Sequence, residues 1–249
     1  MTTITVSSAV ELVRKNLEEL DPNGSVMYHD ENGSDAAYGD NRSLDKLVAY
    51  NLPEAINAVH MAAPVQLLEG VDLTEGDLTE GSSELISVDV CEDDPSLAVL
   101  SFTLNSTTDY LRLVAFRAAD SAIVVTDPLA EASPEARKQL NPYIRGRKDR
   151  PRLVQLQGRH TGPSFKYYTV DAEAFTGSSP LDPFEAIALM KYVKEQKYAG
   201  ETGSTEVEYN ISRRLRQNII DTLTATVLET YGDQRAQVFA QKANSFPQI

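Results

Sequence analysis

The chain has 249 residues, 41% of them apolar and 24% charged, and its 37 acidic and 23 basic residues give a formal net charge of −14. This length and composition exclude an intrinsically disordered chain and provide for one large core or two modest ones. The negative charge repels nucleic acid and anionic membranes at long range, which argues against both as general partners.

Targeting segments are not expected. Glu11, Glu18 and Glu19 interrupt the first twenty residues, whereas a secretory signal needs an unbroken apolar stretch. No window approaches the roughly 18 apolar residues that span a bilayer. We therefore expect a protein that is made in the cytosol and has no membrane partner.

Residues 1–68 are predicted to form a helical unit. Ser8 and Glu11 have the spacing of a capping box, and the apolar residues that follow recur at helical spacing. A second helix is expected to open at Ser43 and to break or kink at Pro53.

Residues 69–178 are predicted to form a β-rich core that is mainly antiparallel. The core opens with two copies of the sequence DLTEG, starting at Asp72 and Asp77, which we interpret as an acidic surface turn or hairpin. Stretches rich in Val, Leu, Ile, Phe and Thr predict strands at 85–90, 97–104, 110–117, 122–126, 153–157 and 165–170.

Residues 179–249 are predicted to be helical. A capping-box-like start at Asp182 precedes an apolar face that ends at Val193. The longest expected helix ends near Tyr231 and carries the apolar stripe Val207, Ile211, Leu215, Ile219, Leu223, Val227 and Leu228. This stripe must be covered by the chain's own sheet or by a neighbouring subunit. Helices followed by strands and then helices indicate an α+β fold.

The sequence predicts no catalytic residue, cofactor or metal, and hence no enzyme. It has none of the motifs GxxxxGK[ST], GxGxxG, HExxH, CxxC or GxSxG. The three histidines are isolated, and the acids after Cys91 disfavour its thiolate form. Glu92, Asp93 and Asp94 lack the twelve-residue loop of a calcium site, which favours a solvated acidic turn.

The charge is unevenly distributed. Residues 47–111 contain no lysine or arginine, whereas residues 137–159 (the basic segment) contain eight, against the single acid Asp149. We expect the basic segment to contact an acidic protein surface, for instance residues 69–94 of a neighbouring copy. Two alternatives are DNA contact, with Tyr143 stacking on a base, and a loop that is merely solvated. The interface candidates are Tyr143, Arg145, Arg147, Lys148, Arg150 and Arg152, the acids Glu92, Asp93 and Asp94, and the apolar residues Ile211, Leu215 and Ile219.

Several segments resemble ring or adaptor proteins at the head-to-tail junction of tailed bacteriophages. Residues 4–20, a polar stretch and residues 44–63 are similar to the helical start of connector adaptors. LRLVAF at 111–116, SPEARKQLNPYIRG at 133–146 and KYYTV at 166–170 resemble segments of such proteins from the crAss-like phages of gut Bacteroidetes. The resemblance is one of pattern and includes no chemical signature.

The resemblance implies a structural virion protein. Twelve copies would form a ring in contact with the portal protein and with other ring or tail proteins, after synthesis in the host bacterial cytoplasm. DNA would pass through the bore without sequence-specific binding, and an acidic bore would keep it from adhering. Residues 69–94 would then face the bore or receive a neighbour's basic segment. Two other hypotheses are a monomeric cytosolic adaptor that binds a partner protein and a metal-independent hydrolase that uses scattered carboxylates.

Overall fold

The computed structural model shows an α+β fold made of two compact units. It describes residues 2–20, 44–79, 85–90, 98–117, 124–126, 128–130, 134, 152–156, 162–169, 172–187, 189–198 and 207–247. The helical unit comprises Met1–Glu69 and Glu195–Ile249, and the β unit comprises Gly70–Lys194. None of the helices in these residues has the length and apolar character needed to cross a bilayer.

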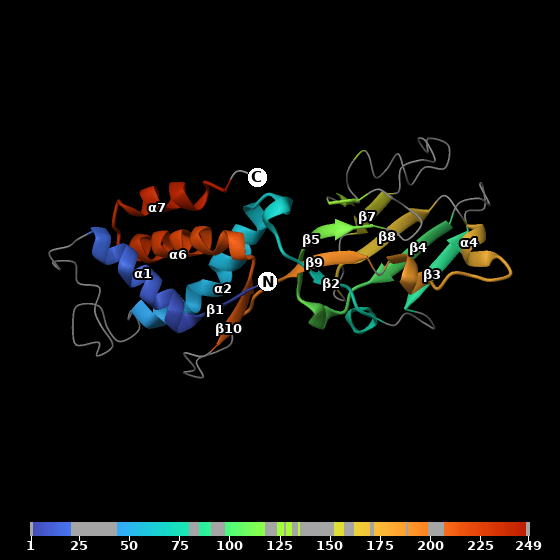
Figure 1. Ribbon diagram of the computed structural model, residues 1–249, viewed down its shortest axis with the longest axis horizontal. Coiled ribbons are helices and arrows are strands. Elements are labelled where there is room, and N and C mark those ends of the chain that lie inside the picture. The colour runs from blue at the N-terminus through green and yellow to red at the C-terminus, as the bar shows by residue number, and fades with distance from the viewer. Residues whose placement is uncertain are drawn as a thin grey trace. The chain divides into compact units, whose positions relative to one another are not determined.

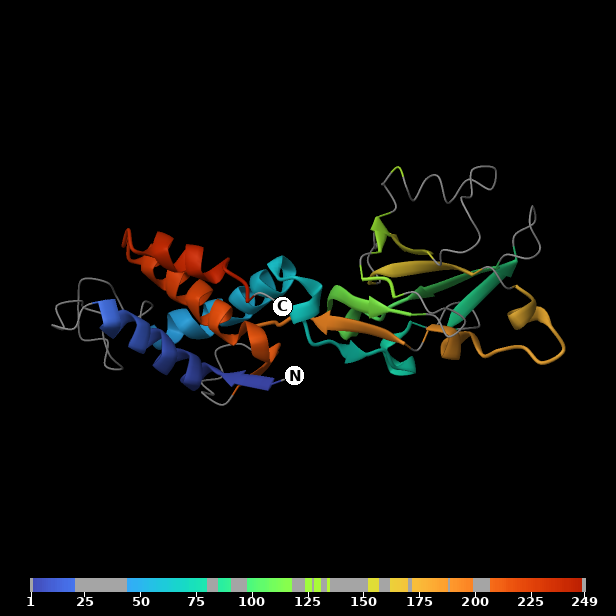
Figure 2. The ribbon, with the colours of Figure 1, turned by 45° about the horizontal axis from the view of Figure 1, so that its top comes forward.

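The helical unit is built around one central helix. It contains β1 (Thr2–Thr5), α1 (Val6–Leu20), α2 (Leu44–Ala62), η2 (Val65–Leu67), β10 (Glu208–Ile211), η5 (Arg213–Leu215), α6 (Arg216–Thr230) and α7 (Ala236–Ala243). Helix α6 packs against α7, α2 and α1, and both ribbon views show it beneath α7 (Figure 1, Figure 2). Because α6 is covered on most sides, buried residues occur around nearly its whole circumference.

The first helix starts earlier than the sequence suggested. The Thr5 hydroxyl accepts a bond from the Ser8 N–H, and the Ser8 hydroxyl accepts one from the Thr5 N–H, each over 3.2 Å. This reciprocal cap makes Thr5 the N-cap residue and places Ser8 inside the helix. Residues 2–5 form β1, which pairs antiparallel with β10.

The β unit contains two sheets. Strands β2 (Val71–Asp72), β9 (Met190–Lys194) and β5 (Tyr110–Phe116) form one of them, in that order. The second has the order β3 (Ile86–Val90), β4 (Ala98–Thr103), β8 (Ser164–Thr169), β7 (Arg152–Leu156) and β6 (Leu129–Ala130). All pairings of these strands are antiparallel except β6 with β7. The short helices of this unit are η3 (Glu75–Asp77), η4 (Ser106–Thr108), α4 (Glu173–Thr176) and α5 (Pro183–Ile187).

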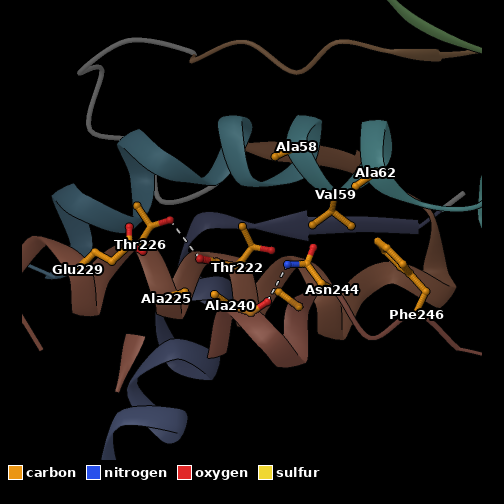
Figure 3. Close-up of a pocket in the computed structure, with 11 residues that line it drawn as sticks. Ala58, Val59, Ala62, Thr222, Ala225, Thr226, Glu229, Ala240, Asn244 and Phe246 are labelled. Atoms are coloured by element: carbon orange, nitrogen blue, oxygen red, sulfur yellow. Dashed lines mark hydrogen bonds between the residues drawn. The ribbon is translucent and has the colours of Figure 1, made fainter. Parts of the chain in front are cut away.

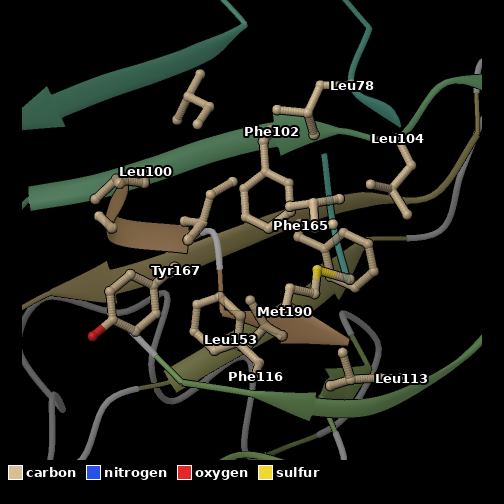
Figure 4. Packing of buried hydrophobic residues seen from close by; sticks show 14 of the residues in the cluster. Leu78, Leu100, Phe102, Leu104, Leu113, Phe116, Leu153, Phe165, Tyr167 and Met190 are labelled. Atoms are coloured by element: carbon tan, nitrogen blue, oxygen red, sulfur yellow. The ribbon is translucent and has the colours of Figure 1, made fainter. Parts of the chain in front are cut away.

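Both sheets contribute to one apolar core (Figure 4). Strand β4 alternates buried and half-buried residues along its whole length, as expected of a strand with one face on a core. Phe102 of β4 stacks on Phe165 of β8, and Phe116 of β5 lies against Tyr167 of β8, with ring centroids 5.4 and 5.1 Å apart. The DLTEG repeat contributes to this core too, because Leu73 and Leu78 are both buried in it.

The predicted strands at 85–90, 97–104, 110–117, 153–157 and 165–170 are confirmed by β3, β4, β5, β7 and β8. At 122–126 the described residues show only a bridge between Val125 and Phe116. Helix α2 runs through Pro53 as one continuous element, with the proline ring buried.

Two predictions for the C-terminal part are wrong. The helical face expected to reach Val193 ends at Ile187, and strand β9 follows it, held between β2 and β5. The helix expected from Val207 begins at Arg216, because Glu208–Ile211 pairs with β1. Helix α7 was not expected. The division also differs from the expected 1–68, 69–178 and 179–249, since the helices from both ends of the chain share one unit.

Candidate functional site

A groove on the helical unit is a concave feature made entirely by described residues. It lies among α2, α6 and α7 and has a volume of about 200 Å³. Figure 3 shows its lining, with Ala58, Val59 and Ala62 of α2 opposite residues of α6 and α7. Five of the lining residues are alanines: Ala58, Ala62, Ala225, Ala240 and Ala243. Short side chains on three neighbouring helices leave the space open.

Hydroxyl groups in the groove are already occupied. Thr222 donates to the carbonyl of Asn218 over 2.8 Å, and Thr226 donates to the carbonyl of Thr222 over 3.1 Å. A threonine bonded back to its own helix in this way has its donor satisfied. The alanine and threonine methyl groups therefore give the groove an apolar character, and Phe246 extends it at one end.

The other end of the groove is acidic. Glu229 lines the groove and is exposed, and Glu54 lies exposed one helical turn before Ala58 on α2. Glu229 is also in the last turn of α6, where the helix dipole is negative. A basic group of a ligand would therefore be favoured at this end.

Such a groove suits a protein side chain better than a chemical reaction. An apolar cavity of about 150 Å³ is large enough for benzene, whereas drug-sized ligands occupy pockets of roughly 300 Å³ or more. The volume here therefore fits one bulky side chain. Its lining contains no cysteine or histidine, and Glu229 is its single titratable residue. Within the described residues, no group of three or more His, Cys, Asp or Glu is placed to hold a metal ion.

No relative was found. No protein-family model matches the chain, and no curated protein or solved structure is significantly similar to it.

Most of the interface candidates from the sequence lie outside the described residues. This holds for Tyr143, Arg145, Arg147, Lys148, Arg150, Glu92, Asp93 and Asp94. The structure places only the backbone of Arg152, which opens β7 opposite Tyr168 of β8.

The apolar candidates Ile211, Leu215 and Ile219 are buried in this chain. Each has 0% of its surface exposed, because β10, η5 and the start of α6 turn them into the helical unit. The stripe was expected to be covered by the chain's own sheet or by a neighbouring subunit. The structure shows it covered by this chain, by helices and β1 of the helical unit. These three residues are not available to a partner, which corrects their prediction as an interface.

The groove itself was not found in the sequence. Its only signal is the recurrence of small residues at helical spacing, Ala58 with Ala62 and Thr222 with Thr226. That signal gains meaning only once α2 and α6 are known to be neighbours.

A buried histidine of α2 holds the point where the chain leaves the helical unit. His60 of α2 is 0% exposed, and its Nε2 accepts the Ser212 N–H over 3.3 Å. The Ser212 hydroxyl in turn accepts the Glu69 N–H over 2.8 Å. Burial lowers the pKa of His60 to about 4, so the ring is neutral at pH 7. This arrangement is structural, since it links α2, the end of β10 and the last residue before the β unit.

A second polar cluster lies in the β unit. The Asp77 carboxylate accepts bonds from the N–H and the hydroxyl of Thr74, over 2.8 and 2.7 Å. Burial raises the pKa of Asp77, but these bonds outweigh it and the pKa lies below its ordinary value. Burial and the Asp77 carboxylate raise the pKa of Tyr192. The charged Asp77 carboxylate stabilises the turn at 74–77, the Tyr192 phenol stays neutral, and neither group is activated as a nucleophile or base.

Proposed function

We propose that this chain is a structural protein that works by contact with other proteins, as a ring subunit at the head-to-tail junction of a tailed bacteriophage. The observation that supports protein contact is the apolar groove among α2, α6 and α7, which has a single acidic end and no reactive pair of side chains. A concave apolar patch with a charged rim is the usual anatomy of a protein-binding surface.

The phage setting of this proposal rests on the resemblance of residues 4–63 and 111–170 to connector and crAss-like phage proteins. The charge is compatible with that setting. A ring of chains with a net charge of −14 each would repel DNA in its bore, so that DNA could slide without adhering. Twelve copies, the portal protein and the other ring or tail proteins are the partners that the resemblance implies.

Particle mass tests this proposal. We expect mass photometry of the purified chain, alone and mixed with its portal protein, to show a species of portal-like multiplicity. Negative-stain images should show rings with a central opening. A chain that stays monomeric both alone and with the portal protein would contradict the proposal.

A monomeric adaptor that binds one partner protein is the second candidate, because the same groove would serve it equally well. The two differ in stoichiometry. An adaptor would give a one-to-one complex in the same mass measurement, with no higher species at any protein concentration.

A further inference from the structure

We infer that the groove receives residues 137–150 of a second copy of this chain, with one apolar side chain in the pocket and arginines beside Glu54 and Glu229. This inference rests on the proposed function, because it names the contact through which copies meet. It is argued from the size of the groove, from its acidic end and from the sequence of the incoming segment.

Size selects the kind of side chain. The groove has a volume of about 200 Å³, enough for one aromatic or branched aliphatic group. Residues 137–150 carry Leu140, Tyr143 and Ile144 within five positions. A single bulky anchor in a small-walled pocket is the arrangement that dominates the affinity of protein interfaces.

Charge selects the segment. The acidic end of the groove consists of Glu229 and the C-terminal turn of α6, and the exposed Glu54 lies one helical turn before the lining residue Ala58. Directly after the apolar anchors, the segment presents Arg145, Arg147 and Lys148. An anchor followed by basic residues thus matches a pocket with carboxylates at one end.

Charge also favours a second copy over nucleic acid. Phosphates would be repelled by Glu54 and Glu229, so DNA does not suit this groove. Two copies of net charge −14 repel each other, and contact between them requires local compensation. Residues 137–159 contain eight basic residues, and no stretch of this sequence of similar length carries more positive charge.

A peptide experiment tests the inference on the full chain. The probe is a fluorescent synthetic peptide with the sequence of residues 136–151, and the readout is fluorescence anisotropy. The acceptor is the full chain with Arg145→Glu, Arg147→Glu and Arg150→Glu, so that its own segment does not compete. We expect saturable binding that weakens as salt is raised.

Two acceptor variants separate the pocket from the charges. Ala58→Leu fills the groove from an exposed position of α2 and should abolish binding. Glu54→Lys with Glu229→Lys should weaken binding by about tenfold, since two exposed pairs become repulsions. Glu11→Lys, an exposed change on α1 outside the groove, is the control and should leave the affinity unchanged. Circular dichroism establishes that each variant is folded.

Three results of the peptide experiment would overturn the inference: no saturable binding, equal affinity in Ala58→Leu and Glu11→Lys, or equal affinity for a peptide of scrambled order. The proposed function fails separately. Rings that form in normal yield from the Ala58→Leu chain would also overturn the inference, because the groove would then not join the copies, and would leave the ring proposal intact. If the unchanged chain never assembles, the ring proposal is contradicted. The peptide experiment then still shows whether the groove binds residues 137–150.

Discussion

Asn57 and Gln196 bond to each other twice. The Asn57 side-chain nitrogen donates to the Gln196 carbonyl over 2.8 Å, and the Gln196 N–H donates to Asn57 Oδ1 over 2.8 Å. Asn57 thereby pairs with the backbone as a neighbouring strand would, just after the chain returns from the β unit at Glu195. The exit at Glu69 is held by a single bond, from the Glu69 N–H to the Ser212 hydroxyl, so both crossings are fixed to the helical unit.

Replacing Asn57 should therefore destabilise the helical unit. Asn57→Ala leaves two half-buried backbone groups of Gln196 without this partner, and we expect the free energy of unfolding to fall by about 2 kcal/mol. Asn51→Ala is the matched control on α2, because among the described residues the side chain of Asn51 bonds to the Leu47 carbonyl of its own helix and to no other element. Urea unfolding followed by circular dichroism measures both. Equal stabilities of the two variants would refute the role of Asn57.

Acid should destabilise the chain through His60. Its folded pKa of about 4 lies below its ordinary value of 6.5, so the unfolded chain takes up the proton first as the pH falls. The contribution of neutral His60 is complete above pH 6.5 and is lost between pH 6.5 and 4, by up to about 3 kcal/mol. Below pH 4 this group adds no further loss.

The variant His60→Gln isolates that effect, because glutamine keeps an acceptor for the Ser212 N–H and does not titrate. Its free energy of unfolding should depend less on pH between 6.5 and 4 than that of the unchanged chain. Urea unfolding at several pH values gives the comparison. Parallel pH curves for the two chains would show that His60 is not the titrating group.

A glycine in the β unit should tolerate no side chain. Gly162 has φ of +108°, and a Cβ atom there would lie 2.3 Å from the Leu104 carbonyl oxygen. Gly162→Ala should lower the free energy of unfolding by at least about 2 kcal/mol, because strain and clash add. Gly76→Ala is the control, since the nearest described atom to its Cβ would be Thr74 Oγ1, at an ordinary contact distance of 3.9 Å. Thermal unfolding of both variants tests this, and a Gly162→Ala chain as stable as Gly76→Ala would contradict the geometry.

Strands with a clear local pattern were predicted correctly, whereas a strand that depends on its partners in the sheet was not. Strands β4 and β8 carry dense β-forming residues that alternate inward and outward, so local pattern was sufficient. Strand β9 follows a helix start, and its apolar residues were assigned to that helix. It is a strand because β2 and β5 pair with it, which is a tertiary effect.

Residues 207–211 show how two periodicities can coincide. Val207 and Ile211 are four apart, a spacing shared by one face of a helix and one face of a strand. The buried Tyr209 decides between them, since it lies on the same strand face as Ile211. The groove could not be predicted from local sequence, because it forms where α2, α6 and α7 meet from distant parts of the chain.

The central claim is that this chain acts through contact with copies of itself, made at the groove. Sedimentation velocity of the unchanged chain and of Ala58→Leu, at matched concentration and salt, tests it most directly. We predict that the unchanged chain sediments as an oligomer and that the Ala58→Leu chain, with an unaltered free energy of unfolding, sediments as a monomer. Identical sedimentation of the two chains would contradict the claim.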